Sequence, residues 1–488
     1  MSEITKLNPQ GVWKNFYSLT QIPRPSKHEA KVVAFVKEFG EKLGLETVVD
    51  EIGNVIIRKP ATPGMENRKG VILQGHLDMV PQKNNEKVHD FTKDPIETII
   101  DGEWVRANQT TLGADNGMGC AAAMAVLESK DLVHGPIEAL FTIDEETGMT
   151  GANHLKAGML KGDILMNLDS ETEGELYVGC AGGVDVNVTM KYDECAAPAG
   201  YTAYRIDVKG LNGGHSGMDI NIGRANANKL LVRFLNHCLY KTDMRLAEIK
   251  GGDMRNAIPR EAYAIVLIAN ADCANFEAEV AKFDGYYKSE FAATEKGIAL
   301  CAAKVAMPAK VVEKEIGEKI IKATFVCPHG VVRMSDSMPG LVETSNNLAI
   351  VECKNGNFGV KCLTRSSVES AKKGTMYKIG TVFDLIGAHV EFSGSYPGWN
   401  PNMNSPILNT MKDCYKRLFN EEAKVMAIHA GLECGLLGYV YPNWDMISFG
   451  PTIEHPHSPV ERVNVASVEK FWKFLVETLK NVPVKCNC

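Results

Sequence analysis

The feature that most constrains the fold is the alternation of helical and strand-like patterns in the first third of the chain. Apolar side chains repeat at helical spacing over residues 32–43, and Gly44 stands where such a helix would end. Short apolar runs at residues 71–74, 137–143 and 164–168 predict buried strands, and the Ala- and Met-rich residues 116–128 predict a packed helix. This alternation predicts an α/β domain with a mostly parallel sheet and helices on both faces.

From about residue 184 the pattern changes. It is strand-like at residues 201–208 and 262–269, helix-like at residues 226–240, and Ala/Lys/Val-rich and helical in part at residues 302–322. A turn-rich segment, 395–406, precedes an amphipathic helix at 407–419 that resumes the earlier pattern. We therefore expect a discontinuous first domain, residues 1–184 and 398–488, interrupted by an inserted α+β domain, residues 185–397.

Charge and cysteine usage exclude several classes of protein. The 488 residues carry a formal net charge of −7, which provides no basic field for nucleic acid, so a small molecule is the expected partner. The 13 cysteines include no Cys-x-x-Cys pair and read as free thiols of a reducing compartment. With no secretory pattern at the first residues and no apolar run of about 18 residues, we expect a cytoplasmic protein without a membrane anchor.

Polar clusters at four strand ends and in one late loop carry the candidate chemistry. They are His76-Leu-Asp78, the segment around Asp115, Asp144-Glu145-Glu146, the segment around Asp169, and Pro456-His457. Ligands of open α/β sheets collect at the carboxyl ends of the strands, so we expect these segments to converge on one crevice.

Imidazole and carboxylate groups without thiolates are typical of a catalytic zinc, cobalt or manganese site. Two such ions about 3.5–4 Å apart can clamp an attacking water molecule. In a His-x-Asp strand end both side chains share one face, so Asp78 can orient the ring of His76. Adjacent Glu145 and Glu146 should point in different directions, which lets one bind metal while the other serves as general base.

Each residue also has a structural interpretation, because a lone His or Asp at a strand end more often caps a helix or turn than binds a metal. His89, His134, His154 and His237 lack a comparable context and are read as surface or hydrogen-bonded interior histidines. Ser216 lacks the spacing of a nucleophile elbow, and no Gly-rich phosphate loop follows a predicted strand. Covalent and nucleotide chemistry are therefore not expected.

An ordered set of motifs adds a family resemblance. The motifs are Arg58-Lys-Pro-Ala-Thr, His76-Leu-Asp-Met-Val-Pro-Gln-Lys-Asn, Thr111-Leu-Gly-Ala-Asp-Asn-Gly, Gly179-Cys-Ala-Gly-Gly, Gly213-Gly-His-Ser-Gly, Arg255-Asn-Ala-Ile-Pro-Arg, His429-Ala-Gly-Leu-Glu-Cys-Gly and Gly450-Pro-Thr-Ile. Along nearly its whole length the chain resembles the co-catalytic zinc metallopeptidases, and specifically the aminoacyl-histidine dipeptidases, also called Xaa-His dipeptidases or peptidase D.

The resemblance implies a role for each candidate residue. Its implied metal ligands are His76, Asp115, Glu146, Asp169 and His457, with Asp115 bridging two divalent ions and His455 as the alternative to His457. Glu145 becomes the general base and Asp78 the residue that orients His76. The insert becomes a lid that builds a homodimer and brings His215, Asn256 and Arg365 to the substrate. Independently of the resemblance, Glu433 lies in a Gly-flanked segment near the expected pocket and is a further substrate-binding candidate.

The function implied is hydrolysis of unblocked dipeptides, preferentially Xaa-His such as β-alanyl-histidine, by water activated by two zinc ions, with Co²⁺ or Mn²⁺ as alternatives. Two other functions stay open. One is an amidohydrolase of the same fold that removes acyl groups from amino acids. The other is a metal-binding relative without turnover, although an inactive site has no need of Glu145.

Overall fold

The computed structural model describes residues 2–485, which form two compact units. Within that range, unit 1 consists of residues 2–179, 401–427 and 432–485, and unit 2 of residues 180–400 and 428–431. Unit 2 thus begins a little before the predicted insert and also takes in a short segment expected in the first domain. None of the helices in residues 2–485 combines the length and apolar character needed to cross a lipid bilayer.

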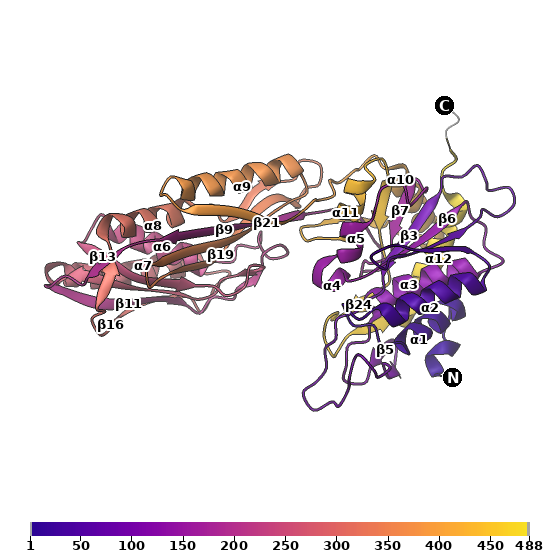
Figure 1. Ribbon diagram of the computed structural model, residues 1–488, viewed down its shortest axis with the longest axis horizontal. Coiled ribbons are helices and arrows are strands. Elements are labelled where there is room, and N and C mark those ends of the chain that lie inside the picture. Colours follow the sequence, from indigo (N-terminus) through magenta and orange to yellow (C-terminus); the bar gives the residue numbers. More distant parts are fainter. Residues whose placement is uncertain (1, 486–488) are drawn as a thin grey trace. The chain divides into compact units, whose positions relative to one another are not determined.

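Unit 1 is built on an eight-stranded sheet (Figure 1). Its order is β1 (Glu46–Val49), β2 (Val55–Lys59), β6 (Ile137–Thr142), β3 (Val71–His76), β7 (Ile164–Asn167), β23 (Asp445–Ser448), β8 (Glu175–Cys180) and β22 (Lys424–Ile428). The four central strands β6, β3, β7 and β23 pair in parallel, whereas β1, β2 and β8 pair antiparallel with their neighbours. The α/β class is confirmed, but the sheet is mixed, and parallel pairing is confined to its centre.

Helices and a smaller sheet complete unit 1. The helices are η1 (Glu3–Lys6), α1 (Gln10–Thr20), α2 (Ala30–Lys42), α3 (Ala114–Glu128), α4 (Glu145–Gly148), α5 (Thr150–His154), α10 (Pro406–Phe419), α11 (Glu433–Val440) and α12 (Val465–Asn481). The small sheet has the order β24 (Ile453–Glu454), β25 (Arg462–Asn464), β5 (Trp104–Ala107) and β4 (Thr98–Asp101). Helix α2 packs on β1 and β2, α3 on β3 and β6, and both α10 and α11 on β23.

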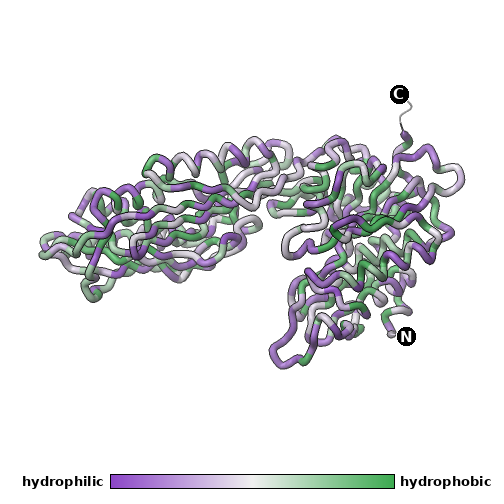
Figure 2. Tube along the Cα trace, viewed as in Figure 1, coloured by the Kyte–Doolittle hydropathy of each residue, from purple (hydrophilic) through white to green (hydrophobic). Residues whose placement is uncertain are grey.

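The central strands β3, β6 and β7 are buried on both faces. All residues of β3, β6 and β7 are buried, as expected for strands of a covered parallel sheet. Figure 2 shows this apolar interior and the more polar connecting loops. Because the strands are parallel, their carboxyl ends lie at one edge, where His76 is opposite Thr142 and Gln74 is opposite Asn167.

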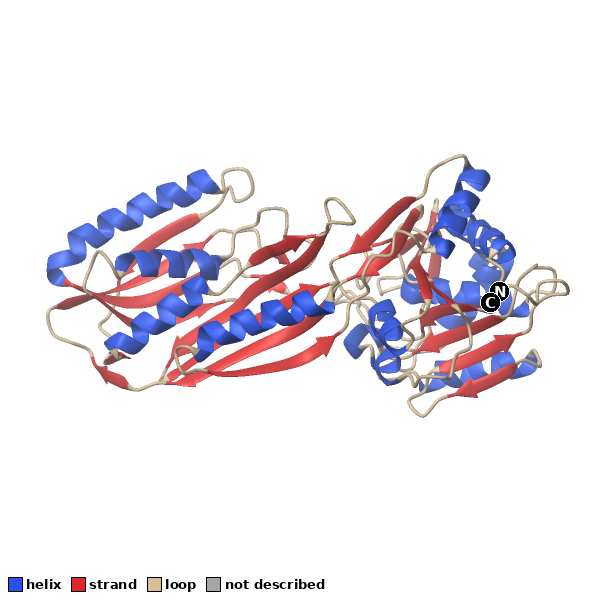
Figure 3. Cartoon of the chain, turned by 90° about the horizontal axis from the view of Figure 1, so that it is seen from above, coloured by secondary structure: helices blue, strands red, loops and turns tan. Residues whose placement is uncertain are grey.

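Unit 2 is an antiparallel sheet covered by helices (Figure 3). The sheet has the order β16 (Ala299–Lys304), β11 (Tyr201–Lys209), β15 (Ala262–Ala269), β13 (Met244–Gly251), β19 (Val342–Lys354), β20 (Asn357–Ser366), β9 (Gly182–Lys191) and β21 (His389–Tyr396), and β18 (Gly330–Met334) also pairs with β19. Two short pairs are β10 (Glu194–Ala196) with β17 (Lys310–Val312), and β12 (Gly214–His215) with β14 (Ala257–Ile258).

The helices of unit 2 are η2 (Asn270–Asp272), α6 (Ala227–Cys238), α7 (Cys273–Glu290), α8 (Lys314–Val326) and α9 (Glu369–Asp384). Alternate residues of β9, Val184, Val186 and Val188, enter one core together with Leu231 and Phe234 of α6. This alternation is the pattern of a strand with one buried face. The predicted α+β character of the insert matches this architecture.

Candidate metal centre and active site

His76 occupies the end of the central strand β3, and its two ring nitrogens face different partners. Nδ1 lies 3.3 Å from Asp78 Oδ1, while Nε2 lies 3.1 Å from Asp115 Oδ1 and 3.3 Å from Asp169 Oδ1. His76 and Asp78 are both buried. The carboxylate beside Nδ1 therefore fixes the ring so that Nε2 points at the two other carboxylates, the arrangement by which a buried Asp orients a metal-binding histidine.

The second oxygen of Asp115 faces a second histidine. Asp115 Oδ2 lies 3.0 Å from His457 Nε2, which in turn lies 3.0 Å from Glu146 Oε2. Asp115 thus belongs to two groups of ligand atoms, one with His76 and Asp169 and the other with Glu146 and His457. This is the arrangement expected of a carboxylate that bridges two ions.

The donor set fits two divalent cations. Neighbouring donor atoms lie 3.0–3.3 Å apart, close to the spacing of about 3.3 Å between ligands that each lie about 2.0–2.1 Å from a tetrahedral ion. Within residues 2–485, the buried oxygens Glu146 Oε1 and Asp169 Oδ1 have no hydrogen-bond partner. Buried, crowded carboxylates with oxygens that lack a hydrogen-bond donor are costly unless cations balance them, so these five side chains are suited to hold two.

Asp78 also holds the segment that carries the two glutamates. Its Oδ1 accepts a hydrogen bond from the Glu145 N–H at 3.0 Å, and its Oδ2 accepts from the Glu146 N–H at 3.2 Å and from the Ser26 hydroxyl at 2.8 Å. Glu146 reaches His457, whereas Glu145 lies with His76 and Glu146 in a third group of potential ligand atoms. One carboxylate therefore positions both the ring of His76 and the first turn of α4.

The pKa values of the site follow its burial and charge. Burial raises the pKa of Glu145 well above its usual value, and nearby Asp169, Glu433 and Glu146 add to the rise while His76 opposes it. Burial alone would also raise the pKa of Asp78, but the hydrogen bond and charge of His76 and the N–H of Glu145 lower it to about 2. Glu145 is thus the more basic carboxylate, the property required of a group that accepts a proton.

Glu433 lies beneath the cluster. It is fully buried, and its Oε2 accepts hydrogen bonds from Gln74 Nε2 at 2.6 Å and from Thr142 Oγ1 at 2.7 Å. Gln74 Oε1 continues the network by accepting from Asn167 Nδ2 at 2.6 Å. This placement favours a role in joining the ends of β3, β6 and β7 over the contact with substrate that the sequence suggested.

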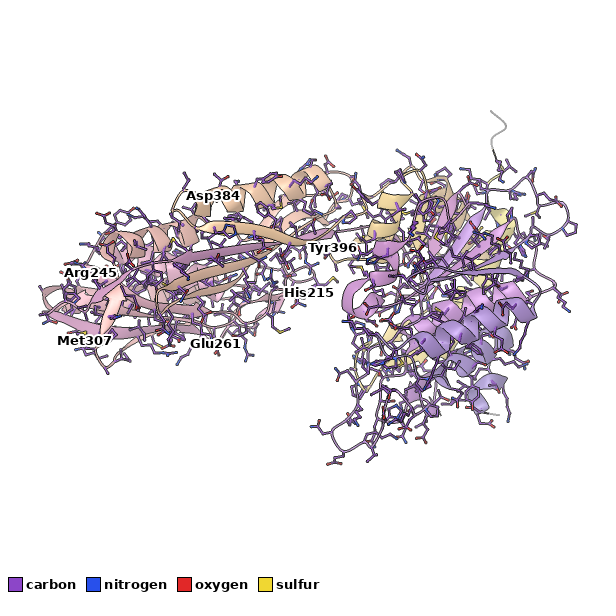
Figure 4. The ribbon with its side chains drawn as sticks, in the orientation of Figure 1. His215, Arg245, Glu261, Met307, Asp384 and Tyr396 are labelled. Atoms are coloured by element: carbon purple, nitrogen blue, oxygen red, sulfur yellow. The ribbon has the colours of Figure 1, made fainter. Side chains whose placement is uncertain are left out.

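The other substrate-binding candidates lie in unit 2 and form a group of their own. Ser216, next to His215, donates its N–H to the main-chain oxygen of Asn256 at 2.8 Å. The Arg365 guanidinium, which is buried, lies 3.4 Å from Ser216 Oγ and 3.2 Å from the hydroxyl of Tyr396. Figure 4 shows His215 and Tyr396 toward the same end of this unit. Sequence reasoning missed Tyr396, which is the second residue of the turn-rich segment 395–406.

The hydrogen bonds of His215 define its protonation. Nδ1 accepts from the main-chain N–H groups of Gly217 at 3.2 Å and Met218 at 3.1 Å. Burial, together with the charge of Arg365, lowers the pKa of His215. The neutral ring therefore carries its proton on Nε2 and presents that N–H as a donor.

His455 and His457 are both exposed and both have a positive φ, but only His457 belongs to one of the groups of ligand atoms, so the geometry favours His457 in this loop. Arg24 and Glu461, which sequence reasoning missed, are buried beside the cluster and bind only main-chain groups there. Hydrogen bonds to main-chain groups leave no pattern of side chains in the sequence, so the sequence offered no signal for Arg24 or Glu461.

Comparison with known proteins identifies the family. The family model described as Peptidase family M20/M25/M40 matches residues 72–481. The chain belongs to this peptidase family. It is 47% identical over 485 residues to the cytosol non-specific dipeptidase of Escherichia coli strain K12, a match covering 99% of this chain and 100% of that protein.

Solved structures show the same relationship for this M20/M25/M40 member. The aminoacylhistidine dipeptidase of Vibrio alginolyticus is 48% identical with a TM-score of 0.95, and the match covers 99% of each chain. The aminopeptidase PepT of Bacillus cereus ATCC 10987 is 16% identical with a TM-score of 0.56, covering 98% of this chain and 99% of that one, which shows a shared fold. The predicted resemblance and hydrolase class are confirmed.

Proposed function

We propose that this chain is a metal-dependent dipeptidase that hydrolyses unblocked dipeptides and prefers Xaa-His substrates such as β-alanyl-histidine. The observation that carries the proposal is the pair of ligand groups joined by Asp115, with Glu145 beside them. Full-length similarity to two proteins named as dipeptidases supports the substrate class. One relative is named a non-specific dipeptidase and the other an aminoacylhistidine dipeptidase. Both names support cleavage of dipeptides, whereas only one supports the proposed preference for histidine.

The proposed centre is held by His76, Asp115, Glu146, Asp169 and His457. Two divalent ions, Zn²⁺ by preference with Co²⁺ or Mn²⁺ as alternatives, would polarise the carbonyl of the peptide bond and make the attacking water more acidic. Glu145 then accepts the proton of the attacking water and returns it to the leaving amine. Asp78 keeps His76 oriented and holds the main chain of Glu145 during this transfer.

In the same proposal, unit 2 supplies the groups that recognise the substrate. The Nε2–H of His215 donates to the oxygen that becomes negative as the peptide bond is attacked. The guanidinium of Arg365 matches the planar carboxylate of a dipeptide, and Tyr396 and Ser216 hold that guanidinium in place. Asn256, whose main-chain oxygen accepts from the N–H of Ser216 beside His215, is a further polar contact for the substrate.

The proposed setting is a cytoplasmic homodimer formed through unit 2, with small peptides as substrates and neither nucleic acid nor membrane as partner. The net charge of −7 disfavours phosphate backbones, and the Escherichia coli relative is named a cytosol enzyme. The proposal also includes a catalytic domain formed by residues 1–184 and 398–488, with unit 2 acting as its lid.

Two other functions are less well supported. An amidohydrolase of N-acyl amino acids would need an apolar site for the acyl group, and both full-length relatives described above are named dipeptidases. A metal-binding protein without turnover would have no use for Glu145, whose raised pKa suits proton transfer.

A substrate panel tests the proposed function. We expect purified protein with added Zn²⁺ to release histidine from β-alanyl-histidine and other free Xaa-His dipeptides, and more slowly to cleave dipeptides without histidine. The amino-acetylated dipeptide should have a kcat/KM lower by at least about tenfold, because a site that pairs with a charged amine rejects a blocked one. Faster cleavage of the acetylated substrate would establish the amidohydrolase instead, and no release from any substrate would establish an inactive relative.

A further inference from the structure

Glu461 binds the loop that carries Asp115 through its main chain. It lies between β24 and β25, four residues after His457, and only 2% of its surface is exposed. Its Oε2 accepts from the N–H groups of Leu112 at 2.7 Å and Gly113 at 3.0 Å, and its Oε1 accepts from those of Ala114 at 2.7 Å and Asp115 at 3.2 Å. One carboxylate thus satisfies four consecutive N–H groups, the last of them from Asp115 itself.

A buried cation holds the same loop from its other side. Arg24 Nη2 donates to the Gly113 oxygen at 2.6 Å, and Nη1 donates to the Leu77 oxygen at 2.9 Å and the Asp78 oxygen at 3.0 Å. Gly113 has φ of 70°, and a Cβ at this position would lie 2.6 Å from Arg24 Nη2, so a side chain does not fit. Arg24 and Glu461 therefore connect the segments of His76, Asp115 and His457 through their backbones.

We propose that Glu461 is a positioning residue of the metal centre, which fixes the main chain of Asp115 relative to the loop of His457. This inference rests on the proposed two-metal site. Asp115 Oδ1 faces His76 and Oδ2 faces His457, so a small displacement of its backbone changes its distances to both histidines. Partners that hold metal ligands from behind contribute about 10- to 100-fold to metal affinity.

Both the negative charge and the length of the Glu461 side chain contribute to holding the loop of Asp115. Two of the four N–H donors, those of Leu112 and Gly113, precede α3, and the other two belong to its first residues, Ala114 and Asp115. An ionised carboxylate is favoured here because hydrogen bonds to a charged acceptor are stronger than those to a neutral one. Glu461→Gln keeps the size of the side chain but replaces one acceptor oxygen with an NH₂ group. That group would face two N–H donors, so the loop must move or leave them unpaired.

Glu138 provides a matched control, because it is another buried carboxylate that accepts main-chain N–H groups. Its Oε2 accepts from Lys161 at 2.7 Å and Gly162 at 2.8 Å, and its Oε1 accepts from Arg58 Nε at 2.9 Å. It lies near the amino end of β6, whereas the proposed ligand Glu146 follows the carboxyl end of that strand. A loss caused merely by disturbing a buried carboxylate should affect the Glu138→Gln variant as much as the Glu461→Gln variant.

The test is a titration of the metal-free wild type, Glu461→Gln and Glu138→Gln chains with Co²⁺, following affinity and the visible absorption of the bound ion. We expect Glu461→Gln to bind at least one ion about 10- to 100-fold more weakly and with an altered spectrum. The loss should be larger for the ion of the His457 group, since Glu461 belongs to that loop. Glu138→Gln should bind like the wild type.

Glu461→Asp keeps the charge but is one methylene shorter. If Glu461→Gln does not fold, the Co²⁺ affinity of Glu461→Asp tests the inference in its place. We expect a smaller loss of Co²⁺ affinity in this variant. The inference is overturned if the folded Glu461 variants bind both ions with wild-type affinity and spectrum, or if Glu138→Gln loses as much affinity. Dipeptide hydrolysis by the wild type is scored separately, so a chain that binds Co²⁺ normally but cleaves nothing refutes the proposed function alone.

Discussion

Replacing Glu145 with Gln is expected to lower kcat by about 10²–10⁴-fold while the metal content stays at the wild-type level. The amide has nearly the size of the carboxylate but cannot accept the proton of the attacking water. The raised pKa of Glu145 makes the carboxylate a stronger base than an ordinary glutamate, so its loss should be costly. Steady-state hydrolysis of β-alanyl-histidine and elemental analysis of the same preparation measure both quantities.

The neighbouring Glu146→Gln variant is the control for this prediction. Glu146 Oε2 lies 3.0 Å from His457 Nε2, and its other oxygen is buried without a hydrogen-bond partner among the described residues. We expect Glu146→Gln to bind metal more weakly than the wild type, and excess metal to restore part of its activity. Retained metal in Glu146→Gln combined with metal loss in Glu145→Gln would show that the two roles are exchanged.

The second large effect is expected in unit 2. His215→Ala should lower kcat by about 10²–10³-fold, because it removes the N–H that stabilises the developing oxyanion. Arg365→Lys should mainly raise KM, since an ammonium group cannot form the paired hydrogen bonds that a guanidinium forms with a carboxylate. Full kinetics on a free dipeptide and on its carboxyl-amidated form separate the two effects.

Controls for these variants come from the same unit. His237 pairs with Glu279 and Arg233 with the exposed Glu290, so His237→Ala and Arg233→Lys alter similar side chains outside the proposed site. Both controls should leave kcat and KM close to the wild-type values. Wild-type kinetics in both the His215 and Arg365 variants, or equal cleavage of free and amidated dipeptides, would refute the role of unit 2.

Much of the fold was predictable because burial leaves a simple pattern in the sequence. The helix predicted over residues 32–43 is α2 (Ala30–Lys42), and the apolar runs at 71–74, 137–143 and 164–168 are strands β3, β6 and β7. The Ala/Lys/Val-rich residues 302–322 were harder, because only the part from Lys314 is helical while Ala299–Lys304 and Lys310–Val312 are strands. Composition does not distinguish an edge strand from a helix when the periodicity is weak.

The candidate site was predictable to the extent that it uses side chains at strand ends. His76, Glu146 and Asp169 lie close together because they end or follow the parallel strands β3, β6 and β7, which end at one edge of the sheet. Asp115, at the start of α3, and His457, in the loop between β24 and β25, complete the cluster. Glu461 and Arg24 could not be found in this way, since their partners are main-chain groups that every residue has. Glu433 illustrates the opposite case, because its motif suggested the pocket while its side chain lies in the hydrogen-bonded layer below.

Removal and return of the metal tests the central claim most directly. Hydrogen bonds to Asp115 and Glu146, together with their charges, raise the pKa of His457 to about 11. The pKa of His76 is also raised well above its usual value, because the neighbouring carboxylates outweigh burial. Both rings are therefore protonated in the metal-free protein at pH 7 and must release protons to bind an ion. We predict that the chelated protein does not hydrolyse β-alanyl-histidine, and that added Zn²⁺ restores hydrolysis with proton release, reaching a maximum at two ions per chain. Full activity in a preparation shown by elemental analysis to be free of metal would contradict the account.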